Sequence, residues 1–181
     1  MGKGIDSLKI KKRSQKLLFM EVKGTDGSHF ERLEGFTTQT HNANPKEHNR
    51  QYVDEDTERT DVTGYSESVG YTFDHYIGQP ALEEIVKITE EELIASDAVR
   101  RILTVDLSTA TAAPGGGSNP SGMGNGVICD AYVRPYAIVP SSNGDSTDCM
   151  TYSGDFKSRG EKTKCRAHIA VDKQTATIES E

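Results

Sequence analysis

The stretch DVTGYSESVGYTFD, residues 61–74, decides the fold. Its apolar residues, from Val62 to Phe73, alternate with polar ones over much of the span, which is the pattern of a β-strand with one buried face. Gly64 and Gly70 interrupt the alternation and are typical of β-bulges. With its flanking residues, the stretch 60–76 therefore predicts two strands.

Other runs rich in β-branched and aromatic residues predict further strands on both sides of this stretch. The runs 16–22 and 30–38 are separated by a turn of Gly and Asp residues, so we expect them to form a hairpin. The remaining predicted strands are 99–107, 127–139, 150–158, 164–171 and 176–178. Many strands with long polar connections favour a mainly β chain, either a sandwich or a barrel.

One segment has the signature of a helix, and it follows Gly78. Pro80 suits the first turn of a helix, and the adjacent pair Glu83 and Glu84 complements the positive end of the helix dipole. Leu82 and Ile85 fall on one stripe, which predicts a helix with one face packed on a sheet.

Three polar segments connect the predicted strands. Residues 39–58 form a long stretch with almost nothing to bury, and such a connection is uncommon unless it is functional or ordered by a partner. Residues 108–126 form a Gly-rich loop by composition, and residues 140–148 form another polar loop. These loops, above all 39–58, are the candidate interaction segments.

At 181 residues, we expect the chain to form one domain, 1–181. Its charge is unevenly distributed along the sequence. The net charge is −7, yet residues 1–16 carry six Lys or Arg residues against one Asp, a charge of +5, which leaves −12 for the rest. A basic N-terminal arm on an acidic body can pair with an acidic neighbour. The acidic total argues against tight binding of nucleic acid.

Composition sets further limits on the class of protein. Apolar residues make up 34% of the chain, which predicts a thin core, and no run approaches the ~20 apolar residues that span a bilayer. We therefore expect a soluble, unexported protein without membrane insertion. The cysteines Cys129, Cys149 and Cys165 are odd in number and lack a CxxC spacing, so we interpret them as reduced thiols.

No catalytic or cofactor motif is evident in the sequence. His41 and His48 with the acidic trio Asp54, Glu55 and Asp56 are a candidate metal cluster, but their spacing matches no known ligand template. The Gly-rich segment lacks the Lys-Ser/Thr of a phosphate loop and leads into a predicted strand. We therefore predict a chain that is not an enzyme and binds no cofactor or metal.

Assembly with other copies explains the remaining features better than a free monomer does. Exposed strand edges invite pairing, and long loops lose conformational entropy unless a partner orders them. Strands that pair between subunits and a loop that folds over a neighbour turn both features into contacts.

The order of elements resembles that of a known family. The stretch 61–74, the Pro-initiated acidic helix and then SDAVRRILTVDL, residues 96–107, resemble the major tail, or tail tube, proteins of long-tailed bacteriophages, of the kind found in phages of Gram-positive bacteria. The likeness covers most of the chain and rests on element order and a few phrases. The Gly-rich loop and the loop 140–148 match no pattern of that family.

The resemblance implies a β-sandwich with one flanking α-helix and long polar loops, assembled into hexameric rings whose inner strands form a continuous barrel. Stacked rings would form a virion tail tube, assembled in the host cytoplasm, that conducts DNA into the host cell with transient, non-specific contact. Its partners would be other copies and tail proteins such as the tape measure and the terminator. The resemblance assigns to residues 39–58 the long loop that reaches an adjacent subunit or ring. The candidate interface residues are Lys9, Lys11, Lys12, Arg13, His41, Asn44, His48, Arg50, Tyr52, Asp54, Glu55 and Asp56.

Two alternatives stay open at this point. A tail terminator or a capsid decoration protein shares the same assembly logic. A β-sandwich module that binds a carbohydrate or peptide is the alternative from another class, although the absence of Trp and the 7% of aromatic residues disfavour sugar stacking.

Overall fold

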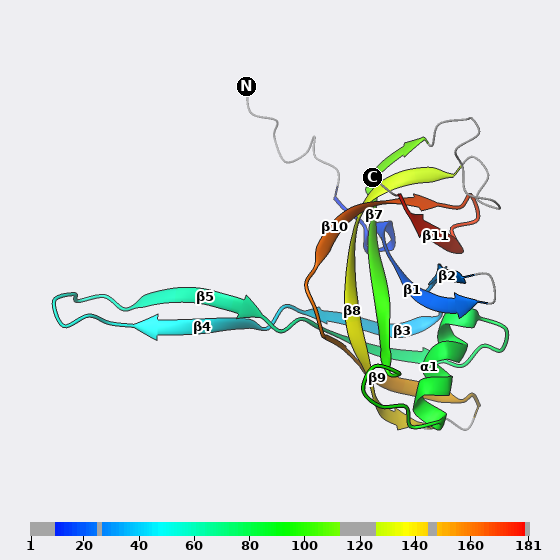
Figure 1. Ribbon diagram of the computed structural model, residues 1–181, viewed down its shortest axis with the longest axis horizontal. Helices are drawn as coiled ribbons and strands as arrows, with labels where there is room; N and C mark the ends of the chain where they lie inside the picture. The colour runs from blue at the N-terminus through cyan, green and yellow to red at the C-terminus, as the bar shows by residue number, and fades with distance from the viewer. Residues whose placement is uncertain (1–9, 25–26, 113–125, 145–147, 180–181) are drawn as a thin grey trace. The chain divides into compact units, whose positions relative to one another are not determined.

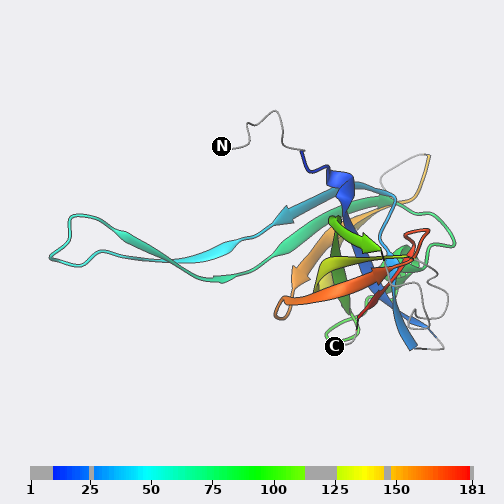
Figure 2. The ribbon, with the colours of Figure 1, turned by 90° about the horizontal axis from the view of Figure 1, so that it is seen from above.

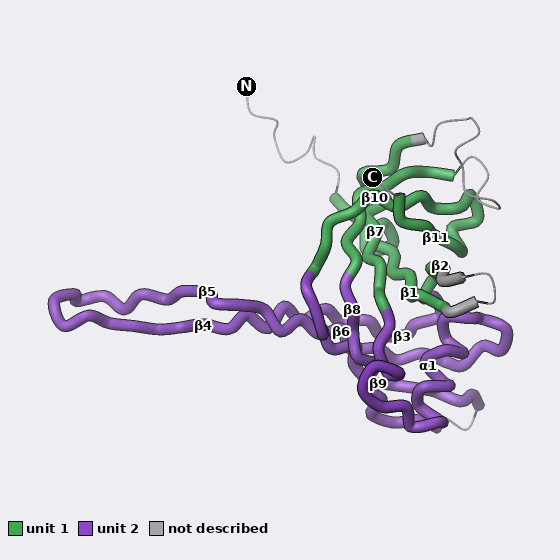
Figure 3. The backbone as a smooth tube through the Cα atoms, viewed as in Figure 1, with its two compact units in different colours: residues 1–33, 101–133, 162–181 green, residues 34–100, 134–161 purple. Residues whose placement is uncertain are grey.

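The computed structural model of the chain describes residues 10–24, 27–112, 126–144 and 148–179, and the chain divides into two units (Figure 3). Unit 1 comprises residues 1–33, 101–133 and 162–181, and unit 2 comprises residues 34–100 and 134–161. The described residues are mostly β-strand with one α-helix, which confirms the mainly β prediction.

Unit 1 is a closed β-barrel (Figure 1). Its strands pair in the order β10, β11, β2, β1, β7 and β8, and a further antiparallel pairing between β8 and β10 closes the ring. The strands are β1 (Lys16–Gly24), β2 (Gly27–Arg32), β7 (Val99–Ala112), β8 (Val127–Asn143), β10 (Thr163–Ile169) and β11 (Thr175–Ile178), with the later part of β8 and the start of β7 in unit 2.

Alternate residues of the barrel strands fill its interior, as the two-residue period of a strand requires. Phe19 and Leu103 are fully buried there, and small residues such as Ala131 and Ala167 leave room for them. The core cluster consists of Leu17, Phe19, Phe30, Leu103, Val105, Cys129, Ala131, Ala167, Ile169 and Ala176.

Unit 2 contains a sheet whose strands pair in the order β8, β9, β6 and β3. Its elements are β3 (Phe36–Asn42), β4 (Pro45–Arg50), β5 (Arg59–Tyr65), β6 (Ser68–Asp74), α1 (Pro80–Glu90) and β9 (Thr151–Ser158). The strands β4 and β5 pair with each other in a separate two-stranded sheet. The predicted strand pair within 60–76 is thus confirmed as β5 and β6.

One face of the unit 2 sheet is aromatic and packs against α1. Phe73 and Phe156 are fully buried, and the rings of Tyr71 and Phe156 stack with centroids 4.4 Å apart. The helix contributes buried side chains, among them Leu82, and Glu90 at its end accepts a hydrogen bond from the Tyr152 hydroxyl at 2.9 Å. The predicted helix and its start at Pro80 are therefore confirmed.

Three expectations need correction. The expected sandwich is a barrel, because the pairing of β8 with β10 joins strands that would be free edges in a sandwich. The single strand expected at 30–38 is two strands, since Gly35 adopts a φ of 80° and ends β2 before β3 begins. The expected loop 39–58 includes the end of β3 and all of β4.

The predicted Gly-rich loop, 108–126, lies mainly outside the described residues. Its first part, through Ala112, belongs to β7. β8 likewise extends to Asn143, into the segment expected to be a polar loop at 140–148. Among the described residues, no helix is both long enough and apolar enough to cross a membrane.

Candidate assembly interface

A two-stranded arm, residues 45–65, extends from the unit 2 sheet (Figures 1 and 2). The arm consists of β4, the turn after it and β5, and it continues the paired strands β3 and β6. Every residue of β4 is exposed, as are the residues of β5 apart from the half-buried Gly64. The segment predicted to reach a neighbour therefore lies in an ordered ribbon with exposed surfaces.

Asn44 fixes the root of the arm, where β3 passes into β4. Its φ of 42° is left-handed, a conformation that Asn tolerates better than most residues. Its side-chain amide donates to the Ser66 carbonyl at 3.0 Å and to the Ser68 hydroxyl at 3.2 Å. The Ser66 amide donates back to the Asn44 carbonyl at 3.0 Å, so Asn44 ties the two chains of the root together.

A polar cluster around Glu67 lies beside the root. The Glu67 carboxylate accepts hydrogen bonds from Arg134 at 2.8 Å and from the Tyr136 hydroxyl at 3.0 Å. Nδ1 of His41, a predicted interface residue, lies 3.9 Å from the same carboxylate. Burial, and then the charge of Glu67, raises the pKa of Tyr136 above its ordinary value, so the hydroxyl stays a donor.

The tip of the arm is acidic, and its residues form contacts with one another and with the ends of β4 and β5. The Glu55 amide donates to the Tyr52 carbonyl at 3.0 Å, which closes a turn, and the Glu55 carboxylate pairs with Arg59. The guanidinium groups of Arg50 and Arg59 lie 5.9 Å and 5.8 Å from the centre of the Tyr52 ring, within cation–π range. Asp54 and Asp56 belong to the same exposed tip.

The candidate metal cluster is divided between the two ends of the arm. His41 lies in β3, His48 lies opposite Asp61 within the arm, and the acidic trio lies at the tip. Among the described residues, no three His, Cys, Asp or Glu side chains form a group that could hold a metal ion.

The described part of the N-terminal segment makes contacts within unit 1. Lys11 forms an ion pair with Asp106, and this contact, together with the Ser108 hydroxyl, lowers the pKa of Asp106 to about 2. Arg13 donates to the Lys16 carbonyl at 2.8 Å, and Lys12 is exposed. Lys9, also predicted as an interface residue, lies outside the described residues.

The second face of the unit 2 sheet is polar and consists largely of short side chains. One row of hydroxyl residues crosses all its strands, because Thr38 pairs with Thr72, Thr72 with Ser153 and Ser153 with Ser142. Asp155 lies on the same face, and Lys157 is the one basic residue in these paired rows among the residues that the structure describes.

The outer edge of β3 is open among the described residues. β3 stands last in the strand order of unit 2 and pairs with β6 on its inner side. An unpaired strand edge presents free backbone N–H and C=O groups to another strand.

Comparison with solved structures identifies chains of similar fold, whereas comparisons of the sequence do not. No family model matches the sequence, and no curated protein matches it significantly. Among solved structures, a chain from the tail of an empty GTA particle, computed with helical refinement and C6 symmetry, matches with a TM-score of 0.56 and 12% identity, covering 85% of this chain and 98% of that chain. The chain has the fold of a tail protein.

Two further matches come from an anti-feeding prophage. A chain of its six-fold symmetrised baseplate matches with a TM-score of 0.47 and 7% identity over 87% of this chain and 96% of that chain. A chain of its tube-terminating cap matches with a TM-score of 0.46 and 11% identity over 90% and 95%. The match to the GTA tail chain confirms the expected resemblance to tail proteins at the level of the fold.

Sequence reasoning missed several residues of this tail-protein fold that organise the arm. Glu67 and Arg134 are far apart in sequence, and no local signal predicts their contact. The irregular pairing at Thr63, beside the exposed Val62 and Tyr65, could have been predicted from the sequence, because the neighbouring Gly64 indicated a bulge.

Proposed function

We propose that this chain is a structural subunit of a phage tail tube, which assembles into stacked rings that conduct DNA. The observation that carries the proposal is the exposed arm, which continues β3 and β6 of a tail-protein fold and projects from unit 2 (Figure 1). An isolated two-stranded ribbon is marginally stable in water, so an arm of this kind needs a neighbour to cover it.

The open edge of β3 supports ring formation. Pairing of this edge with a strand of the next copy satisfies its backbone groups and repeats around an axis until the ring closes. The C6 symmetry of the GTA tail, whose chain shares this fold, supports six copies in each ring.

The polar face of the unit 2 sheet suits the wall of a DNA conduit. The side chains of its hydroxyl row are short and uncharged. Elsewhere on this face, the two acidic residues Asp74 and Asp155 outnumber the one basic residue, Lys157. DNA binds proteins mainly through contacts of Lys and Arg with phosphate, so a face of this composition lets DNA pass without holding it. The aromatic face is already covered by α1, which leaves the polar face for the lumen.

The remaining parts of the proposal concern the virion. The subunit would assemble in the host cytoplasm, become part of the tail and meet a tape measure protein inside the tube and a terminator at its end. Its basic N-terminal segment, residues 1–16, would contact an acidic surface of an adjacent ring. The lysines that precede Lys11, together with Lys12, would make this contact.

Electron microscopy of the purified protein tests the proposal. We expect rings and tubes from the intact chain at high protein concentration or on addition of a tail initiator. Replacing residues 45–65 with a short Gly-Ser linker between Asn44 and Ser66 should prevent tubes while the barrel and sheet stay folded, because those two residues already bond to each other. A strictly monomeric intact protein under both conditions would contradict the tail function, and single rings that never stack would indicate a terminator instead.

A further inference from the structure

The direction of the arm depends on its root, because the strands of the arm are exposed. β4 and β5 pair only with each other in their two-stranded sheet, and every residue of β4 is exposed. A segment with few buried contacts moves easily about the point where it joins the fold. The residues where β3 and β6 continue into the arm therefore decide how freely it moves.

The hydrogen bonds of Asn44 join the two chains of the root to each other. Its partners are Ser66 and Ser68, which lie on the chain that returns from the arm. These bonds keep the two chains together, but they do not join them to β8 or β9. A second set of contacts is needed to fix the direction of the ribbon relative to the rest of the sheet.

Glu67 supplies these contacts, since it lies between Ser66 and the start of β6 and reaches two further strands. Its backbone carbonyl accepts a hydrogen bond from the Ser158 amide, at the end of β9, at 2.9 Å. Its carboxylate accepts hydrogen bonds from Nη1 of Arg134 at 2.8 Å and from the Tyr136 hydroxyl at 3.0 Å. Both donors lie in β8, so Glu67 joins the root to β8 and β9.

Arg134 is itself held by the residues that follow β9. Its Nε donates to the Gly160 carbonyl at 2.8 Å, and the Arg159 amide donates to the Pro135 carbonyl at 3.0 Å. This segment lies so close to β8 that a Cβ on Gly160 would be 2.6 Å from the Pro135 ring. The Arg134 guanidinium therefore cannot follow a movement of the Glu67 carboxylate without breaking its own contacts.

The ion pair of Glu67 and Arg134 is largely shielded from water. Their side chains are 16% and 13% exposed, whereas Arg101, in the ion pair with Glu21, is 48% exposed. Separating two shielded charges is costly, because little water is present to solvate either of them. The pair therefore opposes any movement of the root that draws the carboxylate away from the guanidinium.

The same carboxylate lies beside the other chain of the root. His41 lies in β3, shortly before Asn44, and its Nδ1 is 3.9 Å from the Glu67 carboxylate. β3 and β6 pair with each other and are the two strands that continue into the arm. Both chains of the root are thus next to one carboxylate that is fixed to β8.

We propose that Glu67, held by Arg134 and Tyr136, is the residue that positions the arm, so that the unassembled chain already holds the arm in one direction. A segment that is ordered before it binds loses less conformational entropy on binding. A positioned arm therefore lowers the protein concentration at which subunits assemble. The position of the arm concerns the chain by itself, and only this consequence for assembly rests on the proposed tail function.

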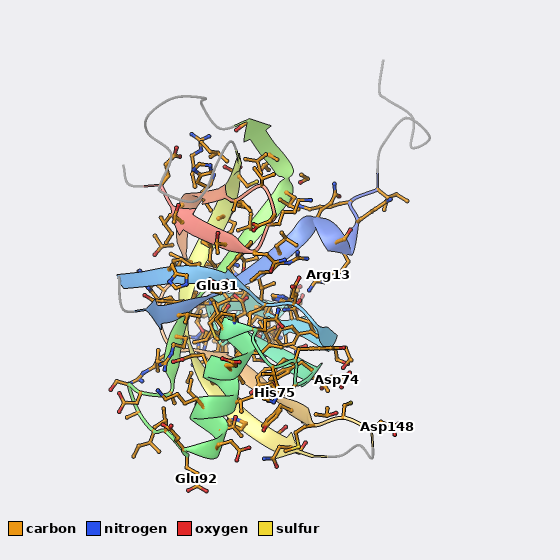
Figure 4. All side chains as sticks on the ribbon, turned by 90° about the vertical axis from the view of Figure 1, so that its right-hand side faces the viewer. Arg13, Glu31, Asp74, His75, Glu92 and Asp148 are labelled. Carbon is orange, nitrogen blue, oxygen red and sulfur yellow. The ribbon has the colours of Figure 1, made fainter. Side chains whose placement is uncertain are left out.

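Distance measurements between two spin labels test the position of the arm in unassembled protein. The three cysteines are replaced by Ala or Ser, and the labels are attached at Val53→Cys in the tip and Lys87→Cys on α1, both exposed positions. α1 follows the end of β6 away from the arm, and Figure 4 shows the helix from that side, with Glu92 labelled beyond its end. We expect one narrow distribution of distances in double electron–electron resonance, and a broad distribution would overturn the proposal.

Two variants remove the positioning contact. Glu67→Gln and Arg134→Met should each broaden the distribution, because each removes one charge of the pair and leaves the other shielded from water. The double variant should broaden it no more than either single variant, since both residues act through one contact. Tyr136→Phe loses one hydrogen bond to the same carboxylate and should broaden it less, so it keeps the test valid if a charge variant fails to fold.

Arg101→Met is the matched control, because it breaks an ion pair of the same kind, with Glu21 in unit 1. It should leave the distribution unchanged. A second pair of labels, at Lys87→Cys and the exposed Thr38→Cys, reports on the body of unit 2 and should be unaffected by every variant. Unchanged arm distances in both charge variants, equal broadening by Arg101→Met, or broadening of both label pairs would overturn the proposal.

Assembly of the unlabelled protein separates this proposal from the tail function. Glu67→Gln should raise the protein concentration needed for tube growth by about threefold or more, because each subunit then orders its arm as it binds. An unchanged concentration would overturn the role of a positioned arm in assembly. An intact chain that never assembles would contradict the tail function, while the distances in unassembled protein would still decide whether Glu67 positions the arm.

Discussion

Asn44 controls the root of the arm through its backbone conformation and its side chain together. Ala at this position loses two side-chain hydrogen bonds and must adopt the left-handed φ of 42°, so we expect Asn44→Ala to destabilise the root by about 2 kcal/mol. Asn44→Gly relieves the backbone cost and should destabilise it by about 1 kcal/mol. Hydrogen exchange of the Ser66 amide measures both, and equal effects of Ala and Gly would show that the backbone conformation does not matter.

Asp106 gives the N-terminal segment a measurable dependence on pH. Its pKa of about 2 lies below the ordinary value, so its contact with Lys11 stabilises the fold at neutral pH, and this stabilisation is lost as pH falls from about 4 towards 2. Lys11→Gln should raise the pKa of Asp106, although the Ser108 hydroxyl keeps it below the ordinary value. An NMR titration of the Asp106 carboxyl carbon measures the change, and Lys12→Gln is the control that should leave it in place.

At the scale of elements, β6 and α1 were predictable because each buries one face within its own unit. Val69, Tyr71 and Phe73 alternate with polar residues, and all three are buried. β4 was not predictable, since apart from Pro45 it has no apolar residue to reveal a strand. Its polar composition still indicated that the segment has nothing to bury, and every residue of β4 is exposed.

The same alternation of apolar and polar residues wrongly predicted a buried face on β5. Val62 and Tyr65 suggested a strand with a buried face, yet both are exposed on the arm. Alternation shows that a strand has two different faces, but it does not show that the chain itself covers either of them. The barrel closure was equally hidden, because the pairing of β8 with β10 depends on contacts between distant segments.

β5 carries a β-bulge, because Lys46 lies opposite Gly64 and Glu47 lies opposite Val62, which leaves Thr63 without a partner residue on β4. Inserting one Ala between Lys46 and Glu47 would give Thr63 a partner, restore a regular ladder and move Val62 and Tyr65 from one face of the arm to opposite faces, so we expect it to impair stacking. Deleting Thr63 also restores a regular ladder but keeps Val62 and Tyr65 on one face, because only Gly64 then separates them, so it is the matched control. Electron microscopy should show short tubes or single rings from the insertion and normal tubes from the deletion. Normal tubes from the insertion variant would show that the register of the arm is irrelevant to stacking.

For the molecule as a whole, the net charge of −7 is unevenly distributed. The N-terminal residues carry +5, the residues around α1 are acidic, and the polar sheet face combines Asp74 and Asp155 with Lys157. Ring stacking that depends on the basic and acidic surfaces should weaken at high salt, since exposed charges are screened over about 8–10 Å at physiological ionic strength.

Reversing the charge of the polar sheet face tests its place in the lumen. The double variant Ser153→Lys and Asp155→Lys changes this face from −1 to +2 per subunit, and rings of such subunits should retain DNA, because each Lys that contacts phosphate releases a counterion. Tubes of this variant should co-sediment with a short DNA duplex at low salt and release it at high salt. The double variant Glu91→Lys and Glu92→Gln, at exposed residues just after α1, changes the charge by the same +3 per subunit. It is the matched control and should bind less of the duplex. Equal retention by the two variants would place the polar face outside the lumen, since a face that never meets the DNA path gains nothing from its position in the sheet.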